Sequence, residues 1–401
     1  AGLIRRSSLG RRGRGGALGL PVPPMRAALL GALALLGCAD APVSAAPPTA
    51  PPPLLWPPPV ASSAPPPGSA SAAPEAPPPV AQPAPPTKPR PLARQDGSKQ
   101  DVLLAEGDLL YDKGDYAGAE AAYKKASQAA PKDPAGVVGF VRSRLAKDDV
   151  PTDFGGAKDS PTLKGMVNEL RRAVKLDDGY APAHLELGRA LLVLGKAGDA
   201  HASLQRAVDL DATDPEAFSS LGVCLLAKGD KEGAVKSLSR AADLDPRSAQ
   251  RLANLGTAQM LVGRVAEAIA TYRKAIQLAP NDPGTQNDLG TALLFEARFD
   301  EAITELEKAR RLAPKNAAIL SNLGYAFDQK GQPDKAESLF EEAVALDDRL
   351  VSAWINLGNL HAKRGKLAEA RAAFEKAKAV DPEDPRVKAA FAELAELEKK
   401  P

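Results

Sequence analysis

The sequence predicts an all-α protein, a right-handed superhelix of about eight stacked helical hairpins. Three observations lead to this fold class. A glycine and two alanines return every 34 residues, apolar residues between them follow the period of a helix, and prolines close most repeats. The first hundred residues lack these features, and we expect them to lie outside the fold.

An apolar run follows Met25 and Arg26 and ends at a cysteine, in the sequence MRAALLGALALLGCAD. The run is too short to span a bilayer, which predicts a secretory signal over residues 25–37. Its end, LLGC, resembles the lipobox of bacterial lipoproteins. That resemblance implies cleavage before Cys38 and acylation of the new N-terminal cysteine. A chance LLGC in a leader rich in alanine and leucine is the alternative.

This interpretation makes Met25 the expected start of translation and residues 1–24 a non-native extension. The alternative is that Arg5 and Arg6 belong to a twin-arginine export signal. Both interpretations place the mature chain outside the cytoplasm. We therefore expect the protein in a bacterial cell envelope, lipid-anchored to the outer or inner membrane and facing the periplasm.

Residues 38–99 are predicted to form a disordered linker that follows the anchor cysteine. Twenty-one of the chain's 38 prolines lie between Ala39 and Lys99. Proline removes a backbone donor and fixes φ, so this segment is not expected to enter a core. It should act as a semi-extended tether that holds the repeats away from the membrane.

The repeats occupy residues 100–384, in eight units of two antiparallel helices. Small residues at fixed positions let the two helices approach closely, and larger apolar residues fill the space between them. The glycines at position 8 are Gly107, Gly188, Gly222, Gly256, Gly290, Gly324 and Gly358. The units begin at Gln100, Pro134, Ala181, Pro215, Ala249, Pro283, Ala317 and Val351.

The pattern resembles the tetratricopeptide repeat, a 34-residue unit with Leu-Gly, two conserved small positions and a closing proline. Leu255 and Gly256, Ala268, Ala275 and Pro280 carry it in the fifth unit. The resemblance implies an α-solenoid, because one hairpin cannot bury its apolar faces and neighbours must stack. A last amphipathic segment, residues 385–401, is expected to cap the final hairpin.

The second unit departs from the pattern. Its expected helices are 135–147 and 163–176, and Val141 or Arg142 stands where the glycine belongs. An insertion over residues 148–162 separates them, and it is either a functional lid or a tolerated loop.

Composition argues against catalysis and against nucleic-acid binding. The charges balance, with 52 basic and 50 acidic residues, and the sequence has only three histidines. His184, His201 and His361 have no partners at metal or triad spacing, and Cys224 is expected to be a buried thiol. We therefore predict no enzyme activity, no metal, no cofactor and no small-molecule substrate.

Polar residues recur at position 6 of successive units, where the superhelix would align them along its concave wall. Asparagine both donates and accepts, so the column is suited to hold an extended peptide. It resembles the asparagine ladder of O-linked N-acetylglucosamine transferase. The alternative is that these side chains only support the hairpins. The column consists of Ser220, Asn254, Asp288, Asn322 and Asn356.

Two functions fit these features. The first is a lipid-anchored scaffold, non-enzymatic, that binds an extended peptide or an envelope protein on its concave surface. The second is an accessory subunit of a cell-envelope enzyme or of a pilus or secretion assembly system.

Overall fold

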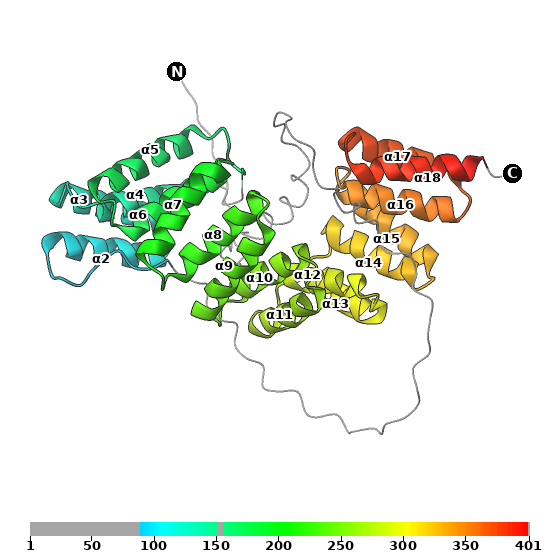
Figure 1. The fold of residues 1–401 in the computed structure, drawn as a ribbon, viewed down its shortest axis with the longest axis horizontal. Coiled ribbons are helices and arrows are strands. Elements are labelled where there is room, and N and C mark those ends of the chain that lie inside the picture. The colour runs from blue at the N-terminus through cyan, green and yellow to red at the C-terminus, as the bar shows by residue number, and fades with distance from the viewer. Residues whose placement is uncertain (1–88, 151–154, 400–401) are drawn as a thin grey trace, which may run out of the picture.

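The computed structural model describes residues 89–150 and 155–399, and all regular elements in this part of the chain are helices. Figure 1 shows the helices in chain order along a curved array, with α2 at one end and α18 at the other. The first helices of the hairpins, here called the A helices, are α2 (Lys99–Asp112), α4 (Ala135–Lys147), α6 (Ala181–Val193), α8 (Pro215–Ala227), α10 (Ala249–Leu261), α12 (Pro283–Phe295), α14 (Ala317–Gln329) and α16 (Val351–Lys363). The B helices are α3 (Tyr116–Ala129), α5 (Pro161–Leu176), α7 (Ala197–Leu210), α9 (Lys231–Leu244), α11 (Val265–Leu278), α13 (Phe299–Leu312), α15 (Pro333–Leu346) and α17 (Leu367–Val380).

A glycine with positive φ reverses the chain between most A and B helices. In the fourth unit Gly229 has φ +83°, and its N–H donates to Leu226 O at 2.9 Å. The Asp230 side chain then accepts the Gly233 N–H at 2.9 Å and caps α9. A left-handed residue followed by an N-cap ends one helix and starts the next within three residues.

The repeated glycines at position 8 let the two helices of a hairpin touch. A Cβ on Gly256 would lie 2.7 Å from the Tyr272 ring, and one on Gly358 would lie 2.3 Å from the Phe374 ring. The rings themselves are almost fully buried. The small residues are therefore fixed by packing, as the sequence predicted.

In the second unit, the close helix contact lies between α4 and the preceding helix, α3. Gly136 and Gly139 of α4 face the preceding helix: a Cβ on Gly136 would lie 2.5 Å from Ser127 N, and one on Gly139 would lie 2.3 Å from the Tyr123 ring. The glycine missing at position 8 is thus replaced by glycines that pack α4 against α3. The B helix begins at Pro161, two residues earlier than predicted, because the Ser160 hydroxyl caps it.

The described part of the insertion contacts the third unit. Gly155 N donates to Leu192 O at 3.0 Å, and Ala157 N donates to Val193 O at 3.3 Å. These carbonyl groups lie in the last turn of α6, where no backbone N–H of the same helix is available to them. The insertion therefore caps the next A helix.

The array ends with α18 (Pro385–Glu398), which covers α16 and α17. Val387 and Leu394 are buried, and Phe391 stands edge-on to Phe374 with ring centroids 5.8 Å apart. The architecture confirms the predicted all-α solenoid with a final helix on its last hairpin. Of the described helices, none is both long and apolar enough to cross a bilayer.

Candidate peptide-binding surface

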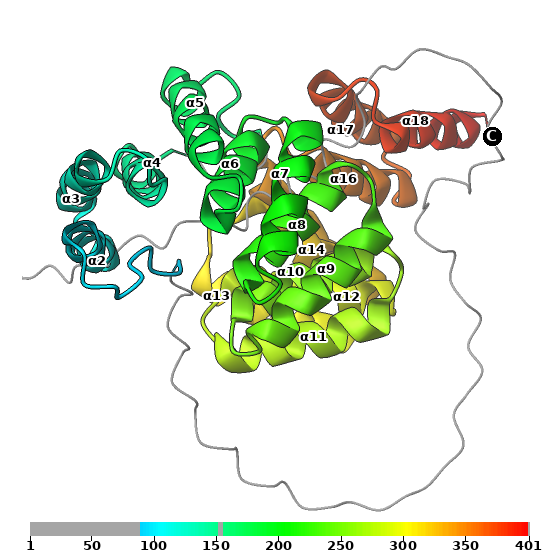
Figure 2. The same ribbon diagram turned by 60° about the vertical axis from the view of Figure 1, so that its left-hand side comes forward.

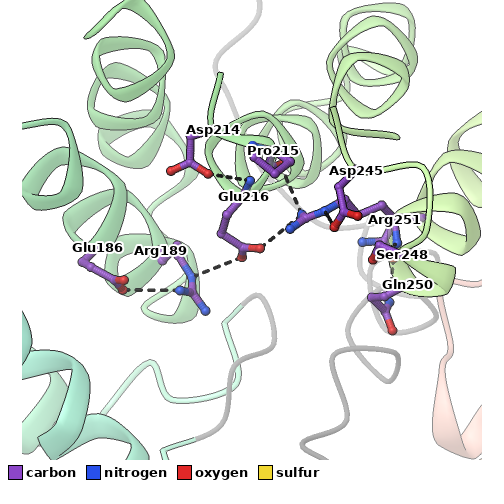
Figure 3. A network of polar contacts seen from close by, with 10 residues as sticks. Glu186, Arg189, Asp214, Pro215, Glu216, Asp245, Ser248, Gln250 and Arg251 are labelled. Carbon is purple, nitrogen blue, oxygen red and sulfur yellow. Dashed lines mark hydrogen bonds and ion pairs between the residues drawn. The ribbon is translucent and has the colours of Figure 1, made fainter. Parts of the chain in front are cut away.

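The A helices carry a line of alternating charges across the second to fifth units. Figure 3 shows much of it. Arg142 on α4 donates from Nε to Glu186 Oε1 on α6 at 3.0 Å, and Arg189 Nη1 lies 3.5 Å from Glu186 Oε2. Glu216 on α8 continues the line, 3.8 Å from Arg189 and 3.2 Å from Arg251 on α10. The line therefore joins four consecutive A helices through their side chains.

The first pair of this line is withdrawn from water. The side chains of Arg142 and Glu186 are each 7% exposed. Burial alone would raise the pKa of Glu186, but the charges of Arg189 and Arg142 and the Arg142 hydrogen bond outweigh it and hold that pKa below its usual range. The charge of Glu186 in turn raises the pKa of Arg189. All three groups are ionised at neutral pH.

A stretch of the chain itself, residues 90–94, lies against this surface. It is part of the blue coil beside α2 in Figure 2. The N–H groups of Leu92 and Ala93 both donate to Asp108 Oδ2 at 2.9 Å, and the Arg94 N–H donates to Asp101 Oδ1 at 2.5 Å. Asp108 and Asp101 belong to α2. One helix thus satisfies three consecutive backbone donors of the stretch.

The other end of the stretch is held by later units. Arg142 Nη1 donates to Arg90 O at 3.1 Å. The Arg90 side chain reaches Asp211 Oδ2 at 2.6 Å and Thr213 O at 2.5 Å, just before α8. Burial would raise the pKa of Asp211, but its bonds from Thr213 and the Arg90 charge lower it. The stretch therefore crosses from α2 to the start of α8.

The side chains of residues 90–94 differ in their surroundings. Leu92 is 3% exposed within the apolar core of the first units, and Arg94 pairs with Asp133 at 2.6 Å. The Arg94 guanidinium also lies over the Tyr180 ring, 5.5 Å from its centroid. Pro91, between the two ends, is exposed. Arg90, Leu92 and Arg94, at every other position, thus make the side-chain contacts.

These contacts correct the predicted linker. Residues 89–98 were expected to be disordered and unable to enter a core, whereas Leu92 is buried and the Ser98 hydroxyl caps α2. Pro91 is the last proline of the segment. Each residue from Leu92 to Ser98 therefore has a backbone N–H that can donate to a carboxylate. The signal that sequence reasoning missed is a leucine with an arginine two residues to either side, followed by acidic residues in the next helix. The rest of the linker, the predicted signal and Cys38 lie outside the described residues.

The predicted polar column is divided. Ser220 on α8 and Asn254 on α10 are buried, at 7% and 8% exposure, while Asp288 on α12 is half-buried. Asn254 Oδ1 accepts the Gln250 side-chain amide at 2.9 Å within the same helix. The first half of the column is thus largely covered by its neighbours.

Farther along, the column links neighbouring units. Asn322 Nδ2 on α14 donates to Asn287 Oδ1 at 2.9 Å and to Thr291 Oγ1 at 3.1 Å, both on α12. Asn356 Nδ2 on α16 donates to Ser321 Oγ at 3.3 Å. The amide donors of these two asparagines therefore brace adjacent A helices. Their carbonyl oxygens accept no bond from any described residue.

His184 and Cys224, also singled out from the sequence, contact backbone carbonyl groups of the fold. His184 Nε2 lies 3.0 Å from Asp178 O, and the buried Cys224 lies 3.3 Å from Ala197 O. Burial raises the pKa of the Cys224 thiol to about 11. Across residues 89–150 and 155–399, no group of three His, Cys, Asp or Glu side chains is placed to hold a metal ion.

The hairpin geometry agrees with comparisons to known families. Three family models, each described as tetratricopeptide repeat, match residues 90–134, 185–249, 225–283, 283–349 and 329–394. These hairpins are tetratricopeptide repeats. The matches pass over residues 135–184, where α4 has its displaced glycines and the insertion lies. Tetratricopeptide-repeat proteins are generally scaffolds for protein interaction.

Several solved structures are similar to this chain. A chain of the APC/C hetero-tetramer Cut9–Hcn1 is 18% identical with a TM-score of 0.54, and the match covers 76% of this chain and 57% of that one. PilF of Pseudomonas aeruginosa is 20% identical with a TM-score of 0.46, over 54% of this chain and 98% of that one. TTC0263 of Thermus thermophilus is 26% identical with a TM-score of 0.42, over 45% and 98%. The first likeness shows the shared fold. No curated protein sequence matches the chain.

Proposed function

We propose that this repeat protein is a non-enzymatic scaffold that binds an extended segment of a partner protein on the surface of its A helices. One observation carries the proposal: the surface already holds residues 90–94 by their backbone groups. Asp108 and Arg142 bind backbone N–H and C=O groups of that stretch. Backbone groups are present in every peptide, so the same side chains suit a segment from another protein.

Position 9 of the units offers a direct test. Asp108 and Arg142 occupy this position in the first two units, and Asn359 occupies it in the last. A photo-cross-linking amino acid at Asn359 should trap the partner, whereas the same group at Lys376, exposed on the B helix α17, should not. Mass spectrometry identifies the trapped protein and its cross-linked peptide. Trapping at Lys376 alone would place the partner on the opposite face and contradict the proposal.

The proposal includes a lipid anchor at Cys38, which would hold the scaffold at a bacterial envelope membrane facing the periplasm. Its support is the order of basic residue, apolar run and cysteine around LLGC. Cys38→Ala should abolish incorporation of labelled palmitate in cells and leave an unprocessed precursor. Cys224→Ala is the matched control, because Cys224 is the buried cysteine of α8 and should leave labelling unchanged. Equal labelling of the Cys38→Ala protein would exclude this anchor.

A further inference from the structure

The groups that hold residues 90–94 come from widely separated parts of the chain. Asp101 and Asp108 lie in the first unit, Arg142 in the second, and Asp211 at the end of the third. Arg90 and Asp211 are 121 residues apart in sequence. A linker that merely entered the first helix would need none of the later contacts. The arrangement is that of a peptide bound across several repeats.

The chemistry of the site is selective as well as general. Asp133 and Asp211 receive the two arginines, and the core of the first units receives the leucine between them. A basic, an apolar and a second basic residue at every other position match these three receptors. Residues 90–94, Arg-Pro-Leu-Ala-Arg, have this pattern.

Building on the proposed function, we infer that residues 90–94 are a built-in competitor for the peptide site. They occupy the A-helix surface of the first units until a partner displaces them. The partner segment carries the same pattern, an apolar residue with an arginine or lysine two positions before and after it. Displacement then couples partner binding to release of the stretch that precedes the repeats.

The contacts suit a competitor that can leave. The side chains of Arg90 and Arg94 remain 48% and 45% exposed, and ion pairs at such exposure contribute little. Leu92 is the one fully buried anchor of the stretch. Attachment to the same chain compensates for this weakness, because a short connection gives an effective concentration in the millimolar range. A free peptide must overcome that concentration.

The experiment uses the full chain and a fluorescein-labelled peptide of sequence PRPLARQ, residues 89–95. Fluorescence anisotropy measures its binding to the wild type and to a released variant, Arg90→Glu with Leu92→Asp. Removing a millimolar internal competitor should tighten binding at least tenfold. Adding Asp108→Asn to the released variant should weaken it about tenfold, since one acceptor of two backbone bonds is lost. A peptide with aspartate in place of leucine should not bind.

Matched controls separate release from general damage. Arg240→Glu with Leu312→Asp makes the same two changes at exposed helix positions and should bind the peptide like the wild type. Circular-dichroism melting confirms that each variant is folded, and Leu92→Ala serves if the released variant is not. In the wild type, excess peptide should speed hydrogen exchange at the Leu92 and Ala93 amides, which are otherwise bonded to Asp108.

Each outcome decides something. Equal affinity of the wild type and the released variant would overturn the inference, and so would binding that ignores Asp108→Asn. If the released variant binds unrelated extended peptides but not PRPLARQ, the inference fails and the proposed function stands. If cross-links form at Lys376 rather than Asn359 and no peptide binds either chain, both fail.

Discussion

The two halves of the solenoid use the same repeat positions with different chemistry. In the first half, Glu186 at position 6 of one unit binds Arg142 at position 9 of the unit before it. In the second half, Asn322 at position 6 binds Thr291 at position 9 of its predecessor. The backbone geometry is repeated, but an ion pair in one half becomes an amide–hydroxyl bond in the other. In both pairs position 6 links neighbouring units, through a carboxylate in one and an amide in the other.

The difference lies in what happens when the link is broken. A buried charge that loses its partner is left uncompensated in a medium that solvates it poorly, whereas an amide that loses its partner leaves only unsatisfied dipoles. The charged half should thus be rigidly specified and sensitive to substitution and pH. The amide half should tolerate change, which suits a surface that accepts different partners.

The largest effect is expected for Glu186→Gln. It removes the carboxylate between Arg142 and Arg189 and should lower the free energy of unfolding by about 3–5 kcal/mol. Glu301→Gln is the matched control: Glu301 also lies between two arginines, Arg273 and Arg298, but is 49% exposed. Its loss should change stability by less than about 1 kcal/mol. Urea unfolding followed by circular dichroism compares them, and equal losses would contradict the distinction between the halves.

The same variant should change the response to acid. The pKa of Glu186 is lowered in the folded protein, so between that pKa and the ordinary value near 4.5 the unfolded chain binds more protons. The stabilisation by Glu186 is complete above that range and is lost as pH falls through it. Glu186→Gln should therefore show a shallower loss of stability than the wild type below about pH 4.5. Parallel profiles of the two proteins in urea titrations at several pH values would refute this contribution.

A smaller effect should separate the irregular second unit from the regular ones. Gly136→Ala places a methyl group 2.5 Å from the backbone of Ser127, which cannot move aside as a side chain can. We expect a loss of about 2–3 kcal/mol. Gly165→Ala, on the next helix, meets no atom within 4 Å and should stabilise the protein by about 0.5–1 kcal/mol. Thermal melting gives the sign of each change, and a neutral Gly136→Ala would mean that α4 does not depend on this close approach.

Sequence reasoning succeeded where packing repeats and failed where it does not. The glycine and alanine positions are dictated by helix contact, so their spacing predicted the hairpins and the solenoid. The second unit makes that contact through Gly136 and Gly139, on another face of α4, which the 34-residue register could not indicate. Residues 90–94 were missed because their partners, such as Asp211, are brought near only by the folded array. The position 6 column was predicted from Ser220 onward, but Glu186, at the same position one unit earlier, was not included in it.

The smallest effect concerns the asparagines and decides what the column does. Asn322→Ala removes two side-chain hydrogen bonds to α12, and Asn356→Ala removes one to α14. Each lost bond should lower the free energy of unfolding by about 0.5–1.5 kcal/mol. If the column only braces the solenoid, the combined variant with Asn254→Ala should melt lower, and its binding loss should follow the unfolded fraction. If the Oδ1 atoms of Asn322 and Asn356 also hold a partner, binding should weaken by about one to three powers of ten at temperatures where the variant is fully folded.

The measurement combines melting by circular dichroism with the affinity for the cross-linked partner. Ser237→Ala is the control, since Ser237 lies on the B helix α9 and its hydroxyl bonds within its own unit, to Phe218 O. Unchanged affinity in the folded triple variant would leave the column as bracing alone and restrict partner binding to the charged half.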